Sequence, residues 1–297
     1  MRPIIDDRNR NGQFLILGAS SPQLLKQSSE SLAGRISFLE LTPFLLTEVG
    51  EDFEKDLWLK GGFSRSFLRD KNVTSYEWRE DFIRTFLERD IAGIGGTGIG
   101  LSPETLRRLW RMCAHVHGQT LNLSKLGAAL GVSHHTVRKY IDALEQTFLL
   151  RVLEHYEANL KKRLVKTPKL FIRDTGLLHT LLQIETMDQL YGHPIYGFSW
   201  ESFVNKHLSA VVPRSSLSFF RTSSGIELDL VIRKGQKAVA IEAKATSAPT
   251  VGKGFWNALR AVKPDETYIV APVDDAYPIE NSVVVSPLSI IMENPPF

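Results

Sequence analysis

Two neighbouring apolar segments of the sequence carry charged side chains at alternating positions. Glu227 and Asp229 alternate with apolar residues in the first segment, and Glu242 and Lys244 do so in the second. Successive side chains of a β-strand point to opposite faces, so each pair is expected to share one face of its strand. Carboxylates within buried strands are costly unless they are paired or bind a metal. Because a short turn at 233–236 links the strands, we expect three carboxylates and one ammonium to meet.

The elements that must position these residues lie in residues 195–297. A helix is expected to begin near Ser199, because Trp200, Phe203 and Val204 recur at helical spacing. Besides the two charged strands, the pattern predicts strands at 217–221, 267–271 and 282–285 and a helix at 251–262. The order of elements predicts a mixed α/β domain.

Residues 119–194 have the pattern of a winged helix-turn-helix. A helix over 123–130 ends at Gly131, since glycine accepts the left-handed backbone of a helix exit. Ser133 caps the next helix. The wing strands are expected at 148–153 and 170–172. The apolar face of the second helix consists of Val137, Tyr140, Ile141 and Leu144.

The positive charge of the chain is concentrated in the same region. The net charge is +3, and between Ser133 and Lys169 eight basic residues face four acidic ones, whereas the remaining chain has 28 basic and 29 acidic residues. A basic second helix and a basic wing favour DNA as the partner, although such modules also bind proteins and such charges also serve as a solvated face. The candidate DNA-binding residues are His134, His135, Arg138, Lys139, Lys161, Lys162 and Arg163.

The first part of the chain has two different patterns. Residues 1–50 predict a strand at 13–18, a helix from Ser20 to about residue 32 and a strand at 35–41, as in part of an α/β unit. Two strands are too few for such a sheet, so we expect a partner to supply the rest or the chain to lack its beginning. Residues 51–118 predict a helical lid or linker region, with a flexible glycine-rich run at 93–100.

Composition excludes several classes of protein. The single cysteine, Cys113, excludes an internal disulfide and fits a reducing cytoplasm. No apolar run approaches the length of a membrane span, and no secretion signal is recognised at the start. We therefore expect a cytoplasmic protein with no membrane partner.

The spacing from Asp229 to Glu242-Ala243-Lys244 resembles the core of the PD-(D/E)XK nuclease fold, of the RecB-like, restriction-endonuclease-like type. Glu201 stands where that fold has an acid on its first helix. The resemblance implies that Glu201, Asp229 and Glu242 hold Mg²⁺ and that Lys244 stabilises the attacking water or the transition state. Carboxylate oxygens suit a hard cation, which lowers the pKa of bound water.

A broader resemblance covers nearly the whole chain. The sequence is similar to a prokaryotic family of AAA-type ATPases fused to a helix-turn-helix and a RecB-like nuclease-fold domain of unknown function. Within that family, residues 1–50 resemble the C-terminal remnant of the ATPase core, and Ser20 and Arg35 resemble nucleotide-sensing positions that act only with a partner. The resemblance rests on the Ser133 helix and on residues 18–22, 31–35, 121–123, 159–169 and 173–177.

The sequence departs from this family by lacking the P-loop and the Walker B strand. Without the P-loop lysine and glycines, no group holds the β- and γ-phosphates, so we expect no ATP hydrolysis by this chain alone. The resemblance leaves room for a separate P-loop-containing chain or a homo-oligomer as partner.

Two functions stay open from the sequence. The first is metal-dependent hydrolysis of DNA phosphodiesters, guided by the winged helix. The second is a DNA- or protein-binding module whose nuclease fold no longer cuts, with Glu227 and Asp229 paired to Lys244 or Arg221. A truncated, unstable product is a third possibility.

Overall fold

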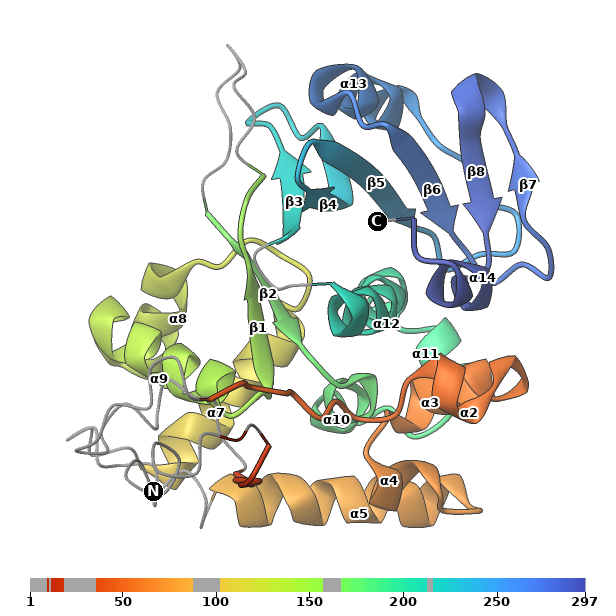
Figure 1. Cartoon of the computed structure of the whole chain (residues 1–297). Helices are drawn as coiled ribbons and strands as arrows, with labels where there is room; N and C mark the ends of the chain where they lie inside the picture. The colour runs from red at the N-terminus through yellow and green to blue at the C-terminus, as the bar shows by residue number, and fades with distance from the viewer. Residues whose placement is uncertain are drawn as a thin grey trace.

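The chain folds into helices and two β-sheets, as the mixed α/β prediction required (Figure 1). The computed structural model describes residues 10, 12–18, 36–87, 102–156, 167–212 and 216–296 of the 297-residue chain. Within these ranges, no helix has both the length and the apolar composition needed to cross a membrane.

Residues 12–18 and 36–41 form no regular secondary structure, so the strands predicted at 13–18 and 35–41 are wrong. Leu15 and Leu39 are 83 % and 95 % exposed. An isolated strand leaves its backbone donors and acceptors unpaired and its apolar side chains in water. No described strand pairs with either segment. Ser20, Arg35 and the helix predicted between them lie outside the described residues.

The described parts of residues 51–118 are mainly helical. The helices pack around Trp58 and Trp110, which are both buried. Ser102 caps the last of them, with Pro103 at its first position. The glycine-rich run at 93–100 lies outside the described residues. The elements are α2 (Leu46–Val49), η2 (Glu51–Phe53), α3 (Glu54–Lys60), α4 (Ser64–Phe67), α5 (Asn72–Thr85) and α7 (Pro103–His115).

The two helices expected on either side of the 131–133 turn are present, with the predicted bounds for the first and the predicted start for the second. Helix α8 (Leu123–Leu130) ends at Gly131, whose φ is +69°, and Ser133 caps α9 (His134–Gln146). The four residues predicted for the apolar face of α9 are all buried. Strands β1 (Leu150–Leu153) and β2 (Lys169–Ile172) pair antiparallel, as expected for a wing.

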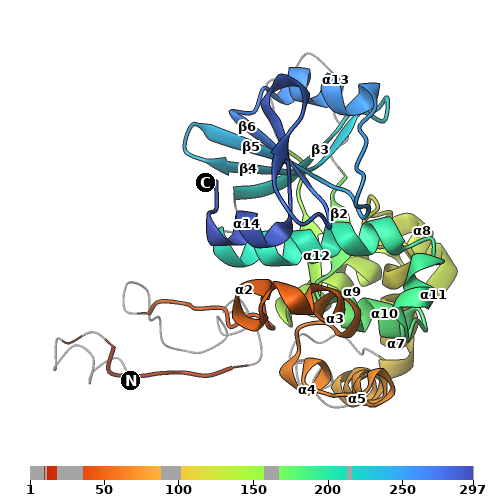
Figure 2. The same cartoon turned by 90° about the vertical axis from the view of Figure 1, so that its right-hand side faces the viewer.

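Three helices follow the wing and connect it to the rest of the molecule. They are α10 (Thr175–Leu181), α11 (Met187–Tyr191) and α12 (Tyr196–Val211). Helix α10 is buried throughout and packs on α3, α5, α7 and α12. Helix α12 lies between α10 and the large sheet (Figure 2).

The large sheet is mixed, in the order β3-β4-β5-β6-β8-β7. Strands β5, β6 and β8 run parallel, and the other neighbours pair antiparallel. Helices α12 and α14 (Leu288–Glu293) lie on one side of the sheet and α13 (Lys253–Val262) on the other (Figure 1). The strands are β3 (Leu217–Arg221), β4 (Glu227–Lys234), β5 (Lys237–Ala243), β6 (Glu266–Val270), β7 (Tyr277–Pro278) and β8 (Val283–Ser286).

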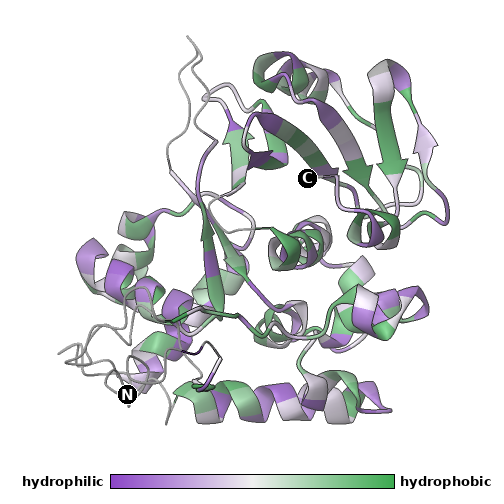
Figure 3. Ribbon diagram, in the orientation of Figure 1, coloured by the Kyte–Doolittle hydropathy of each residue, from purple (hydrophilic) through white to green (hydrophobic). Residues whose placement is uncertain are grey.

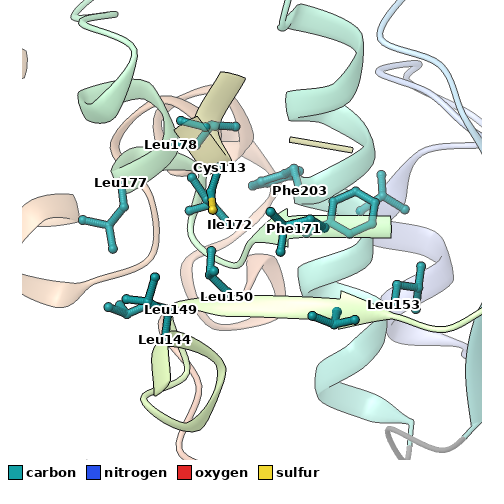
Figure 4. Close-up of a cluster of buried hydrophobic side chains, with 14 of the residues drawn as sticks. Cys113, Leu144, Leu149, Leu150, Leu153, Phe171, Ile172, Leu177, Leu178 and Phe203 are labelled. Atoms are coloured by element: carbon teal, nitrogen blue, oxygen red, sulfur yellow. The ribbon is translucent and has the colours of Figure 1, made fainter. Parts of the chain in front are cut away.

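One hydrophobic core joins these regions. Apolar side chains of the helical region, the helix-turn-helix, the wing and the α12 side of the sheet form a single buried cluster, and a smaller second cluster fills the space beneath α13. The hydropathy colouring shows apolar residues on the strands and on the inner sides of the helices (Figure 3). Around the wing, Leu150 and Phe171 meet Cys113, Leu178 and Phe203 (Figure 4). The wing is therefore part of the core.

Candidate functional site

A buried lysine lies at the centre of the charged residues. The side chain of Lys169, the first residue of β2, is 1 % exposed. Its Nζ lies 2.7 Å from Glu201 Oε1 and 2.5 Å from Glu227 Oε1. It also lies 3.9 Å from Asp229 Oδ1. One ammonium thus faces three carboxylates, which we call the Lys169 cluster.

The backbone brings this lysine to the sheet. After β1 the chain runs beside β3, where Phe219 N–H donates to Glu154 O and Tyr156 N–H donates to Phe219 O. Lys169 pairs with Leu153 at the end of β1, next to β3, and from there it reaches Glu227 and Asp229 of β4. Glu201 reaches the same point from α12.

A bulge in β4 changes the expected alternation. Phe220 of β3 pairs with Leu228 of β4, and Ser218 pairs with Val231. Between these two pairs β4 contains one residue more than β3. Leu228 consequently packs in the cluster beneath α13, whereas Leu230 packs in the main core on the other side. Strict alternation along β4 is therefore wrong, although Glu227 and Asp229 share a face as expected. Both approach Lys169, which the sequence did not predict.

The buried carboxylates are difficult to ionise. Burial raises the pKa of Glu201 to about 8, although the ammonium of Lys169 opposes this rise. Burial also raises the pKa of Asp229, while Lys169 and the N–H of Ala243, which donates to Asp229 Oδ2 at 2.9 Å, oppose it. The three carboxylates raise the pKa of Lys169 against its own burial. The three carboxylates therefore favour the charged form of Lys169.

Glu242 and Lys244 form a second, more open pair. Lys244 Nζ donates to Glu242 Oε1 at 2.7 Å, so the two residues share a face as predicted. The side chain of Lys244 is 33 % exposed. Among the described residues, Glu242 Oε2 is buried and has no hydrogen-bond partner. Burial, together with the charge of Asp229, raises the pKa of Glu242 to about 8.

The predicted Mg²⁺ ligands do not form a common cation site in this arrangement. No three histidine, cysteine, aspartate or glutamate side chains in the described ranges are placed to share a metal ion. The ammonium of Lys169 already lies between Glu201 and Asp229, and Lys244 holds Glu242. These residues therefore do not fit a shared divalent cation as they stand.

Sequence reasoning missed Lys169 as a site residue. It counted Lys169 among the basic residues of the DNA-facing region, because lysines are rarely fully buried. Its place directly before the apolar run 170–172 was a signal that it could belong to a buried strand. Of the alternative ion pairs, Arg221 does approach Glu227, at 3.4 Å, but Lys244 contacts Glu242.

The predicted DNA-binding residues of α9 lie on its exposed side. His134, His135, Arg138 and Lys139 are all exposed. The two imidazole rings lie 4.1 Å apart, and Arg138 Nε lies 2.9 Å from Asp142 Oδ1. Lys161, Lys162 and Arg163 lie outside the described residues.

The fold and site define a mixed α/β protein in which helices α8 and α9 and the β1–β2 pair share a core with a mixed sheet. Residues 51–188 match a domain of unknown function (DUF8612), and residues 196–291 match another domain of unknown function (DUF4143). Lys169 lies in the first matched segment, and its three carboxylate partners lie in the second.

The chain also has mycobacterial relatives. Uncharacterized proteins of Mycobacterium bovis and Mycobacterium tuberculosis are each 38 % identical to it over 292 residues. The match covers 98 % of this chain and 66 % of each relative. No solved structure matches the chain.

Proposed function

We propose that this chain is a DNA-binding protein whose sheet domain stabilises the assembly and does not cut DNA. The exposed side of α9 carries the binding part of the proposal. A helix whose apolar face is buried and whose opposite face carries Arg138, Lys139 and two histidines has the arrangement of a helix that enters the major groove. Lys161, Lys162 and Arg163, which lie between the two wing strands in the sequence, supply the second basic contact of the proposal.

The Lys169 cluster supports the absence of cutting. A metal-dependent nuclease needs carboxylate oxygens that are free to coordinate the ion. In the Lys169 cluster these oxygens face an ammonium that is 1 % exposed and contacts two of them within hydrogen-bond distance. The cluster therefore has the composition of a structural ion-pair network.

Binding is tested with the full chain and a fluorescein-labelled 30-base-pair duplex in fluorescence anisotropy. We expect binding that weakens steeply between 50 and 200 mM salt, because phosphate contacts release counterions. Arg138→Gln with Lys139→Gln should weaken duplex binding about tenfold. The slope of the logarithm of the binding constant against the logarithm of the salt concentration should become shallower by about 1 to 2.

The chain offers a matched control for this pair. Arg233 and Lys234 are also a consecutive, exposed Arg-Lys pair, but they lie at the end of β4. Arg233→Gln with Lys234→Gln makes the same charge change and should leave duplex binding unchanged. Equal losses in the two double variants would show a nonspecific charge effect and overturn the assignment to α9.

Cutting is tested with supercoiled plasmid and single-stranded and duplex oligonucleotides in Mg²⁺ or Mn²⁺. We expect intact DNA after prolonged incubation. Metal-dependent cleavage that Glu242→Gln abolishes would overturn the proposal and establish the nuclease alternative instead.

The finer parts of the family resemblance stay predictions. They are the absence of ATP hydrolysis by this chain alone, a separate P-loop-containing chain or a second copy as partner, and a cytoplasmic location. Isothermal titration with ATP at physiological Mg²⁺ tests the first of these. Binding of ATP would contradict it.

A further inference from the structure

Helix α13 presents a tryptophan between two basic residues on the outside of the sheet domain. Phe255, Ala258 and Val262 are the buried residues of this helix and attach it to the sheet. Another face of the same helix is formed by four residues spaced i, i+3, i+4 and i+7. Together with Glu280, these positions line an open hollow of about 420 Å³; they are Lys253, Trp256, Asn257 and Arg260.

Two of the three charged side chains that line the hollow, Lys253 and Arg260, are basic, and the third, Glu280, is acidic. Helix α13 contains no acidic residue, and Lys253 and Arg260 are exposed. In the described part of the chain, no carboxylate lies within ion-pair distance of either residue, and Arg260 instead donates to the side chain of Asn257. The two cations are seven residues apart, or about 10 Å along the helix axis. They are therefore available to an anionic ligand on both sides of Trp256.

A second hollow of similar size provides a comparison within the molecule. It is lined by Arg65, Arg69 and Trp78, with Ser64 and Leu68. Trp78 already stacks on Phe82, with ring centroids 5.4 Å apart, and lies against Phe63. Trp256 is half-buried against the cluster beneath α13, and in the described residues it stacks on no other ring; its ring contact is an edge arrangement with Phe255.

We propose that the α13 hollow binds single-stranded nucleic acid. A base stacks on Trp256, and Lys253 and Arg260 contact the backbone phosphates on either side of it. This combination of an aromatic platform and a basic track is how single strands are bound without sequence preference. A duplex does not offer a free base face to the indole, so the hollow selects single strands.

This activity goes beyond the proposed duplex binding and uses a different surface. Helix α13 lies on the side of the sheet opposite to α12, and the helix-turn-helix lies on the α12 side (Figure 1). The two surfaces can therefore be tested by separate variants of one chain.

The test measures fluorescence anisotropy of labelled dT15 and rU15 with the full chain. Lys253→Gln with Arg260→Gln should weaken single-strand binding at least tenfold. Trp256→Ala should weaken it by about 5- to 100-fold, the range that stacking of one base supplies. Trp256→Phe, which retains an aromatic face, should keep affinity within about threefold. Comparison of the two probes shows whether DNA or RNA is the better ligand.

The controls separate this proposal from the proposed function. Arg65→Gln with Arg69→Gln changes the same charge at the second hollow and should leave single-strand binding unchanged. Arg138→Gln with Lys139→Gln should weaken duplex binding only. If Trp256→Ala lowers the melting temperature, its loss of binding could come from unfolding. The result for Lys253→Gln with Arg260→Gln, which changes two exposed residues, then decides the test.

Three results would overturn the proposal. They are no binding of either single strand by the unaltered chain, single-strand binding that survives Lys253→Gln with Arg260→Gln, and an equal loss from the control at Arg65 and Arg69. Each of these leaves duplex binding by α9 unaffected, so the two proposals fail separately.

Discussion

The Lys169 cluster and the exposed face of α9 use the same kinds of residue in opposite environments. Lys169 is 1 % exposed and is surrounded by carboxylates from α12 and β4. Arg138 and Lys139 are exposed, and Arg138 forms an ion pair with Asp142 one turn away. A buried charge must be paired to be tolerated, whereas an exposed ion pair contributes little to stability.

The comparison shows how charge divides between folding and binding in this molecule. Removing a charge from the Lys169 cluster leaves other charges buried and unpaired, so it should act on the free energy of unfolding. Removing a charge from the exposed face of α9 should change the affinity for DNA and leave the free energy of unfolding nearly unchanged. Stability and DNA affinity should therefore respond to different variants.

The largest effect is expected for Lys169→Met. Methionine has a similar length but leaves three carboxylates facing one another in the interior. Loss of one partner from a buried ion pair typically costs about 3–5 kcal/mol of unfolding free energy. Urea denaturation monitored by circular dichroism measures this change.

Lys244→Met is the matched control for the buried lysine. Its side chain is 33 % exposed, and in the described part of the chain Glu242 is its one ion-pair partner. We therefore expect a loss of about 1 kcal/mol or less. Equal losses at the two lysines would break the comparison, because burial would then not distinguish them.

A smaller, pH-dependent effect is expected from Glu242. Its pKa rises from the ordinary 4.5 to about 8 on folding. Between these values the folded protein keeps a proton that the unfolded chain has released. The unfolding free energy should therefore fall as pH rises from 5 to 8, and Glu242→Gln should reduce the slope by up to about 1.4 kcal/mol per pH unit.

Glu266 provides the control for this titration. It lies on β6, and its contact with Lys237 lowers its pKa, so its titration falls below this pH range. Glu266→Gln should leave the slope between pH 5 and 8 unchanged. Urea denaturation at four pH values measures both variants, and a slope unaffected by Glu242→Gln would contradict the assignment.

The smallest effect on stability is expected for Arg138→Gln with Lys139→Gln. Surface changes away from special contacts usually alter the unfolding free energy by less than about 0.5 kcal/mol. Urea denaturation should therefore give nearly the same midpoint as for the unaltered chain, although duplex affinity falls. A loss of several kcal/mol would show that α9 is held by these charges and would remove the contrast with Lys169.

Local sequence was sufficient where local interactions decide structure. The boundaries of α8 and α9 follow from the left-handed Gly131 and the Ser133 cap, which both act within a few residues. The turn between β4 and β5 and the closeness of Glu242 and Lys244 follow in the same way, because strand neighbours two residues apart share a face.

Contacts between distant segments could not be predicted in this way. Strands at 13–18 and 35–41 were expected from their apolar residues, but a strand also needs a neighbour, and none of the described strands provides one. The bulge in β4 arises from its pairing with β3 and has no clear local signal.

By itself, the sequence determined the caps between α8 and α9 and the residue types of the charged strands, because these depend on periodicity and capping. It also predicted the succession of α12, β3, β4, β5, α13, β6 and β8, but not the short β7 or the final α14. Only the tertiary structure decided that Lys169 enters the carboxylate cluster and that Glu201 meets it from α12. A lysine is exposed by default, and it becomes buried only where the fold gathers enough opposite charge to compensate its lost hydration.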